Sequence, residues 1–478
     1  MLIGAALRSG GAGTYPVVNP STEQVVGLAP EATAADVADA VAAARTAFPQ
    51  WSATGVADRA ALLRRIGSEL RARSAELGAL MCAEGGCLLA TAESMVERAA
   101  QRFDRFADLL LRQQPIPIAA ETRPHMPPQE TLAFGEISRR PHGVVACITP
   151  FNFPLIGAAA KIAPAIAMGN TVVFKPAPQD PLAVLRLGEI CVDAGLPAGV
   201  VNIISGSQAE TGRVLLASPD VDMVSFTGST VAGTEIYRTG AETMRRMLLE
   251  LGGKGALIVR KDADLEGAVE ALSRVWTYYS GQWCAAPTRA ILHRDVHAEV
   301  VERLRTLGAG LRLGDPSDPA TQMGPVISSL QRDRIEAMIE GAVAAGARQL
   351  IQAPTRGGRE TGFFVPPALL VDCTPDMEVV QNEVFGPVLS VQSYTDDDEA
   401  IALANDSRFG LTSYIYSGDT ARAWELAPRL RSGTVLINLP APHDGLPFGG
   451  VGMSGFGRDN GVFALESYSE PQGIAAGL

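Results

Sequence analysis

The sequence predicts an α/β fold in which helices cover both faces of parallel sheets. From residue 144 onward, short apolar and β-branched runs alternate with stretches of helical periodicity, and the alternation resumes after Gly253. Such alternation is typical of strand–helix–strand units. The 478 residues, 47% hydrophobic and 19% charged, suffice for two or three domains with large cores. We therefore expect a doubly wound parallel-sheet domain, a second α/β domain and a small β arm.

Helices dominate the first part of the chain. After an irregular start, Thr33 and Asp36 have the spacing of a capping box, and apolar residues at helical spacing follow them. A second helix is predicted over about 57–81, and helical character persists to about residue 111. The arginines of the second helix are interpreted as a solvated face; they are Arg64, Arg65, Arg71 and Arg73.

The first parallel sheet is predicted from five apolar runs. Ligands of such sheets bind beyond the carboxyl ends of the strands, so the polar residues after the first, second and fourth runs should contribute to a site. Helices are expected to begin near Pro154, Pro181, Glu210 and Ser229. The five runs are residues 144–148, 171–174, 200–204, 223–226 and 256–259.

The arm is predicted from a segment that has neither helical nor regular strand periodicity. Residues 113–129 contain five prolines, which disfavour a helix, so the segment is interpreted as a crossing segment or arm. A strand over 131–138 and a possible edge strand over 467–475 accompany it.

A second α/β region follows from about residue 253 to 446. Helices are expected near 265–279, 297–307 and 330–345, and strands near 290–293, 386–394, 413–417 and 434–439. The predicted boundaries are 1–112 with 139–252 for the first domain, 253–446 for the second, and 113–138 with 462–478 for the arm and tail.

Composition excludes several classes of function. A net charge of −12 argues against a nucleic-acid-binding face and against attraction to an anionic membrane surface. The six cysteines form no CxxC pair and no zinc-ligand spacing with the five histidines, so no metal site is expected. They are typical of reduced thiols in a cytoplasmic protein. No signal peptide and no apolar run of membrane-spanning length is recognisable.

Cys284 is the candidate nucleophile of the chain. Gly281, Gln282 and Pro287 place it at a bend, whereas an arbitrary free cysteine is more often a buried core residue. A thiol needs a base to become the reactive thiolate, and Glu250 lies in an apolar run that would raise its pKa. These two residues indicate nucleophilic chemistry.

Seven segments in order resemble the aldehyde dehydrogenase superfamily, specifically its NAD(P)-dependent, hydrolytic branch. The 34 residues from Glu250 to Cys284 match that family's spacing (284 − 250). Any one of the segments is a weak signal, but together they span nearly the whole chain. The segments are residues 149–154, 174–177, 226–230, 249–254, 281–289, 383–387 and 447–450.

The resemblance implies a reaction and roles for three residues. The Cys284 thiolate attacks an aldehyde to give a thiohemiacetal, hydride passes to NAD or NADP, and water hydrolyses the thioester. Asn152 and the backbone N–H of Cys284 would stabilise the oxyanion, as such donors do in acyl transfer. Glu250 would be the general base. Members that pass the acyl group to coenzyme A tend to lack this base, so a free acid is the expected product.

The resemblance also assigns a cofactor site, an oligomerisation arm and the roles of the two domains. The first domain would bind the dinucleotide, the second would carry the catalytic cysteine, and the arm and tail would join a homo-oligomer, a dimer or tetramer. Gly228 and Ser229 would present a helix N-terminus to the pyrophosphate. The full set of expected cofactor residues is Ile148, Thr149, Pro150, Phe151, Lys175, Pro178, Gly212, Phe226, Gly228, Ser229, Leu251, Glu383 and Phe385. A GxGxxG match at 450–455 has no clear helix after it and is interpreted as a glycine-rich loop near the site.

Two finer expectations concern specificity. Gly157 and Ala160 stand where many family members carry large tunnel residues, and no arginine is evident to bind a carboxylate, so an aromatic or bulky apolar aldehyde is expected. The aromatic residues near 276–279 and Trp283 could refill that space. Pro178 stands where many NAD-preferring members carry glutamate, so NADP should be tolerated. The alternatives are a semialdehyde dehydrogenase, a Cys-dependent thioester hydrolase and an inactive binding protein on this fold.

Overall fold

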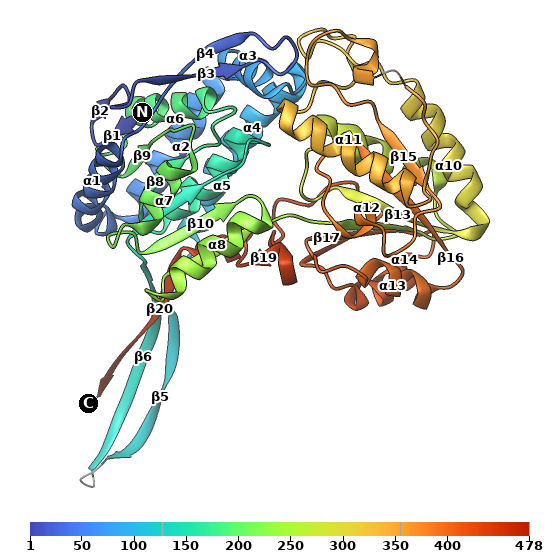
Figure 1. The fold of residues 1–478 in the computed structure, drawn as a ribbon. Helices are drawn as coiled ribbons and strands as arrows, with labels where there is room; N and C mark the ends of the chain where they lie inside the picture. Colours follow the sequence, from blue (N-terminus) through green and yellow to red (C-terminus); the bar gives the residue numbers. More distant parts are fainter. Residues whose placement is uncertain (126–128, 354, 478) are drawn as a thin grey trace.

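The structure is a computed structural model that describes residues 1–125, 129–353 and 355–477. Figure 1 shows two α/β halves, each built around one sheet, and a long β arm that projects from the first half. The predicted fold class is confirmed. Within the described residues, no helix combines the length and the apolar character needed to cross a membrane.

The first half is built on an eight-stranded sheet with the order β19-β11-β10-β7-β8-β9-β1-β2. Strands β7 to β11 run parallel, whereas β1 and β19 join antiparallel at opposite sides of this set. Because the order reverses between β7 and β10, their carboxyl ends flank the position where ligands of such sheets bind. The bounds are β1 Leu2–Ile3, β2 Ala6–Leu7, β7 Val144–Ile148, β8 Thr171–Lys175, β9 Val201–Ile203, β10 Met223–Thr227, β11 Arg246–Glu250 and β19 Gly455–Phe456.

Helices cover both faces of this sheet and bury a separate apolar cluster on each. Along β7, Val145 and Cys147 point into one cluster, while Val144 and Ala146 point into the other. This alternation is the two-residue period of a strand buried on both faces. The helices of this half are α1 Ala34–Ser52, α2 Val56–Ala72, α3 Ser74–Gly85, α4 Leu89–Leu111, α5 Pro154–Ala167, α6 Leu182–Asp193, α7 Ala209–Ala217, α8 Thr230–Ala241 and α15 Gly461–Ser467.

The second half is built on a seven-stranded sheet with the order β14-β15-β16-β13-β12-β17-β18. All neighbours in it are parallel except β14 and β15. Its strands are β12 Gly255–Val259, β13 Pro287–His293, β14 Arg348–Gln349, β15 Ala368–Val371, β16 Val388–Tyr394, β17 Thr412–Tyr416 and β18 Thr434–Ile437. Its helices are α9 Leu265–Thr277, α10 Arg294–Ala309, α11 Ser329–Ala344, α12 Glu378–Gln381, α13 Asp397–Asn405 and α14 Thr420–Leu426.

The arm is a three-stranded antiparallel sheet of β5 (Ile116–His125), β6 (Gln129–Pro141) and β20 (Ser469–Gly477). It leaves Ile118, Phe134 and Ile474 about half exposed (47%, 43% and 52%). Part of the predicted arm, residues 126–128, lies outside the described residues. A role of the arm in joining subunits stays a prediction.

The sequence-based expectations differ from the structure in several places. The run at 256–259, expected in the first sheet, is β12 of the second sheet, where it pairs with β13 and β17. The helix expected over 57–81 is two helices, α2 and α3, which meet at Arg73 with a φ of −107°. The irregular start contains β1 and β2 together with a hairpin of β3 (Thr14–Val18) and β4 (Val25–Pro30). Strand β11, which ends at Glu250, was not anticipated as a strand. The capping box of Thr33 and Asp36 is present as expected.

Candidate active site

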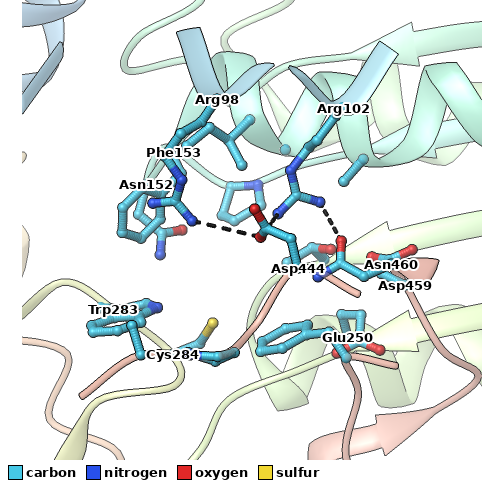
Figure 2. A pocket seen from close by; sticks show the side chains of 18 of the residues that line it. Arg98, Arg102, Asn152, Phe153, Glu250, Trp283, Cys284, Asp444, Asp459 and Asn460 are labelled. Atoms are coloured by element: carbon cyan, nitrogen blue, oxygen red, sulfur yellow. Dashed lines mark hydrogen bonds and ion pairs between the residues drawn. The ribbon is translucent and has the colours of Figure 1, made fainter. Parts of the chain in front are cut away.

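The three residues proposed for catalysis line one cavity of about 420 Å³ (Figure 2). Asn152 follows β7, Glu250 is the last residue of β11, and Cys284 lies in the turn between α9 and β13. The first two come from neighbouring parts of the first sheet and the third from the second half. The fold thus brings together residues that lie up to 132 positions apart in the sequence (284 − 152).

The turn that carries Cys284 is held in an unusual backbone conformation. Tyr279 and Ser280 both have positive φ values, of 49° and 54°. Gln282 is fully buried, and its Oε1 accepts a hydrogen bond of 2.9 Å from the backbone N–H of Ile327. After the cysteine, the Tyr414 hydroxyl donates to the carbonyl of Ala285 at 2.7 Å. These long-range bonds fix the position of the thiol.

The Cys284 thiol sits in surroundings that disfavour its anion. Burial, together with the nearby carboxylates of Glu383 and Glu250, raises the pKa of this thiol to about 12. Backbone hydrogen bonds at Cys284 and Ala285 oppose this rise. The thiol is therefore protonated at neutral pH, and a base must remove its proton before it can act as a nucleophile.

Glu250 has the environment of a general base. Its side chain is 2% exposed, and neither carboxylate oxygen accepts a hydrogen bond from any described residue. Burial raises its pKa well above the usual value, and the charge of Asp459 raises it further. The charges of Lys161 and Arg458 oppose this rise. The glycine-rich loop closes over it, since a Cβ at Gly449 would lie 2.5 Å from Oε1. A carboxylate with such a raised pKa can accept a proton near neutral pH.

Asn152 has one amide hydrogen committed and one available. Its Nδ2 donates to the carbonyl of Gln282 at 3.0 Å, which ties it to the turn before Cys284. Because an amide nitrogen carries two hydrogens, a second donor remains for an oxygen in the cavity. Phe153 follows with a φ of 58°, and Pro154 begins α5, so the chain turns sharply here. The side chain is only 7% exposed.

Aromatic side chains form one wall of the cavity. The Phe153 ring lies 6.1 Å from the ring of Tyr278 in a stacked arrangement and 6.3 Å from that of Trp283, while Tyr278 and Trp283 are 6.0 Å apart. Gly157 and Ala160 also line the cavity, as expected. Two of the large residues named as possible space-fillers, Tyr278 and Trp283, therefore do reach it. The site combines a flat aromatic wall with small residues.

Charged side chains surround the outer end of the cavity, which we call the rim. Arg98 and Arg102 line this rim, whereas Arg105, on the same face of α4, does not line the cavity. Each of the three arginines approaches Asp444 to 4.0 Å. Arg102 also donates to the side-chain oxygen of Asn460 (Figure 2). No arginine at the site was evident from the sequence, yet Arg98 and Arg102 line the cavity. The sequence shows the spacing 98, 102 and 105, but only the fold shows what this face of α4 meets.

The expected cofactor residues gather at the carboxyl ends of β7, β8 and β10. Thr149 is buried, and its Oγ1 has no hydrogen-bond partner among the described residues. Lys175 is 7% exposed, its Nζ reaches the Pro176 carbonyl at 3.4 Å, and burial lowers its pKa to about 8. Gly228 and the N-cap Ser229 begin α8. Ile148 ends β7, and Phe226 lies within β10.

A second set lies between the halves. Glu383 accepts a 2.9 Å hydrogen bond from the N–H of Gly253, and burial raises its pKa to about 7. The ring of Phe385 meets that of Phe151 edge-on, with centroids 5.7 Å apart. The remaining predicted residues either follow strands of the first sheet or lie partly exposed at the surface. They are Pro150 and Leu251, which follow β7 and β11, and the partly exposed Pro178 and Gly212.

This arrangement fits a dinucleotide. A buried hydroxyl without a partner and a buried ammonium with one long hydrogen bond both lack the partners that buried polar groups normally have. They lie at the strand ends, beside a helix N-terminus that favours phosphate. At Gly212 a Cβ would meet nothing within 4 Å, so this edge is open.

The comparisons with known proteins agree with this geometry. The sequence model of the aldehyde dehydrogenase family matches residues 7–474. The chain belongs to the aldehyde dehydrogenase family. It is 36% identical over 466 residues to a chloroplastic betaine aldehyde dehydrogenase of Beta vulgaris, covering 95% of this chain and 91% of the relative. A peroxisomal aminoaldehyde dehydrogenase 1 of Pisum sativum is 37% identical over 467 residues, with 95% and 90% covered.

A solved structure shows the same fold. The betaine aldehyde dehydrogenase of Staphylococcus aureus, in complex with NAD⁺, superposes with a TM-score of 0.95 at 33% identity and covers 99% of this chain and 94% of that one. The identification of the family from seven short segments is therefore confirmed. The named relatives include organellar proteins, so a cytoplasmic location for this aldehyde dehydrogenase stays a prediction.

Sequence reasoning missed a buried polar group beside Glu250 in this aldehyde dehydrogenase. Lys161 is fully buried in α5, where its Nζ donates to Ser225 Oγ at 2.9 Å and lies 3.5 Å from Asp459. The Tyr468 hydroxyl donates to the same Ser225 oxygen at 2.7 Å. A lysine at helical spacing within an otherwise apolar helix was the available signal. The glycine-rich loop at 450–455 lies beside the site, with Gly455 paired to Glu250 across β19 and β11.

Proposed function

We propose that this aldehyde dehydrogenase oxidises an aldehyde to a free carboxylic acid through a covalent bond to Cys284. The observation that carries the proposal is the meeting of Cys284, Asn152 and Glu250 in one cavity. A nucleophile, an oxyanion donor and a buried base are the three groups that the reaction needs. NAD or NADP is the cofactor, in keeping with the family and with the NAD⁺ in the related structure.

The residues act in two stages. In the first, Glu250 takes the proton of the Cys284 thiol and releases it to solvent. The thiolate then forms a bond to the aldehyde carbon, and the carbonyl oxygen becomes an anion that accepts hydrogen bonds from Asn152 and the backbone N–H of Cys284. Bound NAD or NADP would supply the hydride acceptor that leaves a thioester on Cys284. In the second, Glu250 takes a proton from water, the resulting hydroxide adds to the thioester, and the carbon–sulfur bond breaks. The carboxylate leaves and the thiolate is restored.

The reacting part of the substrate is an aromatic or bulky apolar aldehyde. The wall of Phe153, Tyr278 and Trp283 presents flat surfaces against which a ring packs. Gly157 and Ala160 leave room beside it. The relatives named for betaine aldehyde and aminoaldehydes raise a second candidate, a cationic aldehyde, which the same aromatic wall would accept through cation–π contacts.

A thioester hydrolase without a redox cofactor is the rival use of the same residues. The incompletely bonded Thr149 and Lys175 at the strand ends favour the dehydrogenase, because a hydrolase has no need of a dinucleotide site. The rival would release acid from thioesters and produce no NAD(P)H.

The test is the growth of absorbance at 340 nm when the protein is mixed with NAD(P) and a panel of aldehydes. Cys284→Ala should abolish turnover, whereas Cys82→Ala, which changes a cysteine that does not line the cavity, should not. Glu250→Gln should give a burst of about one NAD(P)H per site followed by slow turnover, because thioester hydrolysis loses its base. No absorbance growth with any aldehyde would overturn the proposal, and parental turnover by Glu250→Gln would overturn the role of Glu250.

A further inference from the structure

The rim of the cavity contains more positive than negative charge. Arg98 and Arg102 line the cavity together with Asp444, and Arg274 lines it from α9. The other buried cation, Lys161, already faces Asp459 at 3.5 Å. Among the described residues, Asp444 is thus the only acidic residue within 4.0 Å of Arg98, Arg102 and Arg105, although the charge of Asp459 also acts on Arg102.

The contacts with Asp444 are too long to satisfy the arginines. All three guanidinium–carboxylate separations are 4.0 Å, beyond the 2.7–2.9 Å or so of a charge-assisted hydrogen bond. Arg102 has one further bond, to Asn460, and its side chain is 14% exposed. A largely buried guanidinium that faces a cavity and has a single hydrogen-bond acceptor among the described residues favours a planar anion that can accept two hydrogen bonds.

The position of these arginines relative to the thiol defines which part of a ligand they meet. In Figure 2, Arg98 and Arg102, which belong to α4, lie on the side of the cavity opposite Cys284. Trp283 lies beside Cys284, and Phe153 lies between Trp283 and the arginines. An aldehyde group at the thiol would therefore place the far end of the molecule at the rim.

We propose that the substrate carries a carboxylate at the end remote from its aldehyde, and that Arg98 and Arg102 bind it. The inference rests on the proposed function and names its substrate class. This substrate class accounts for both features of the cavity. The aromatic wall would contact the flat middle part of the substrate, and the rim would bind its carboxylate. A quaternary ammonium or protonated amine would instead bring a positive charge to a cluster of arginines, which disfavours it.

The experiment compares three para-substituted benzaldehydes that differ in charge: 4-carboxy-, 4-methyl- and 4-(trimethylammonio)benzaldehyde. Substituents also change the reactivity of the carbonyl, so the quantity compared is kcat/KM of each variant relative to the parent. The variants are Arg98→Gln and Arg102→Gln. Arg105→Gln is the matched control, because it removes the same charge from the same helix face but does not line the main cavity.

The ratio of kcat/KM for the carboxy over the methyl aldehyde should fall about 10- to 100-fold in Arg102→Gln, and about tenfold in Arg98→Gln. It should change by less than about threefold in Arg105→Gln, as expected for an exposed charge. The ratio of kcat/KM for the trimethylammonio over the methyl aldehyde should instead rise in both cavity variants, because each removes a positive charge from the rim. A carboxy/methyl ratio unchanged in both cavity variants would overturn the inference.

Binding separates the failure of this inference from the failure of the proposed function. Terephthalate and 4-methylbenzoate, titrated calorimetrically into the parent protein, need neither turnover nor a folded variant. Terephthalate should bind at least about tenfold more tightly because its second carboxylate reaches the rim. Equal affinities would overturn the inference even in an active dehydrogenase. Tighter terephthalate binding without any NAD(P)H formation would support the rim as an anion site and overturn the proposed function alone.

Discussion

The cavity has two regions whose side chains are held differently. Asn152, Glu250 and Cys284 form the region that we call the floor, and the charged residues at the outer end form the rim. On the floor, Asn152 and Glu250 are 7% and 2% exposed, and the turn before Cys284 is tied by hydrogen bonds of about 2.9–3.0 Å. At the rim, the side chains of Arg98 and Asp444 are 42% and 36% exposed and stand 4.0 Å apart. The floor is fixed by burial, hydrogen bonds and the close approach of Gly449 to Glu250. The rim is held by long ion-pair contacts.

This difference suggests a division of labour. Groups that stabilise a transition state need fixed positions, because preorganised donors cost no reorganisation during the reaction. Groups that only recognise the far end of a substrate act on all steps alike and can be looser. Floor substitutions should therefore slow the reaction of every aldehyde by a similar factor. Rim substitutions should change which aldehyde, or which cofactor, is preferred.

Among substitutions that leave Cys284 and Glu250 in place, the largest effect is expected for Asn152→Ala. Loss of one oxyanion donor should lower kcat by about 10²–10³. The loss should be similar for carboxy-, methyl- and trimethylammonio-benzaldehyde, because the donor acts on the carbonyl oxygen that they share. Single-turnover formation of NAD(P)H measures this step. A loss confined to one of the three aldehydes would show that Asn152 acts in recognition and that floor and rim are not separate.

Pro178→Glu extends the comparison from the aldehyde cavity to the proposed cofactor site. A carboxylate there should accept a hydrogen bond from the ribose of NAD and repel the 2′-phosphate of NADP, each worth about 0.5–1.5 kcal/mol. The two add, so the NAD/NADP ratio of kcat/KM should rise by about 5- to 150-fold. Gln179→Glu, at the exposed neighbouring position, is the charge-matched control.

The parent is expected to accept NADP. A preference for NAD of more than about 100-fold, or about 2.7 kcal/mol, would show that Pro178 does not set the choice. In that case Glu31 is the carboxylate to change next, because its charge acts on the ammonium of Lys175.

The smallest expected effect is a shift of the pH profile in Asp459→Asn. Glu250 is a base only when ionised, so hydrolysis of the thioester slows as the pH falls through its raised pKa. The charge of Asp459 raises that pKa and Lys161 lowers it. Removing the carboxylate while keeping the lysine therefore moves the acid limb to lower pH. Asp444→Asn at the rim is the control and should leave the limb in place; a shift to higher pH in Asp459→Asn would contradict this account.

Much of the fold was accessible from the sequence because its signals are local. The strands at 144–148 and 223–226 and the helices after Pro154 and Ser229 were predicted to within a residue or two. Their periodicity and caps depend on neighbours in the chain. Strands β1 and β2 were missed because two residues carry no periodicity. They form by pairing, β1 with β9, whose partner residue is Ile203, and β2 with β1.

Some residues of the candidate site were likewise predicted from the sequence, and others were not. Cys284, Glu250 and Asn152 were predicted from short segments, and they share a cavity, while their catalytic roles stay proposals. The rim arginines and the Lys161–Asp459 pair were missed. A lysine in an otherwise apolar helix and arginines at helical spacing are visible in the sequence, but only the fold shows which residues they meet. The domain boundaries, the homo-oligomer and the cytoplasmic location also stay predictions.

By itself, the sequence determined the fold class, the family and the residue types available for chemistry. These follow from spacing and periodicity, which are properties of adjacent residues. Only the tertiary structure decided that α4 turns three arginines toward Asp444 and that Glu250 has no hydrogen-bond partner among the described residues. Charge balance and desolvation depend on which distant segments pack together. The pKa of Glu250 and the net charge at the rim are therefore set by the tertiary structure and cannot be derived from neighbouring residues in the chain.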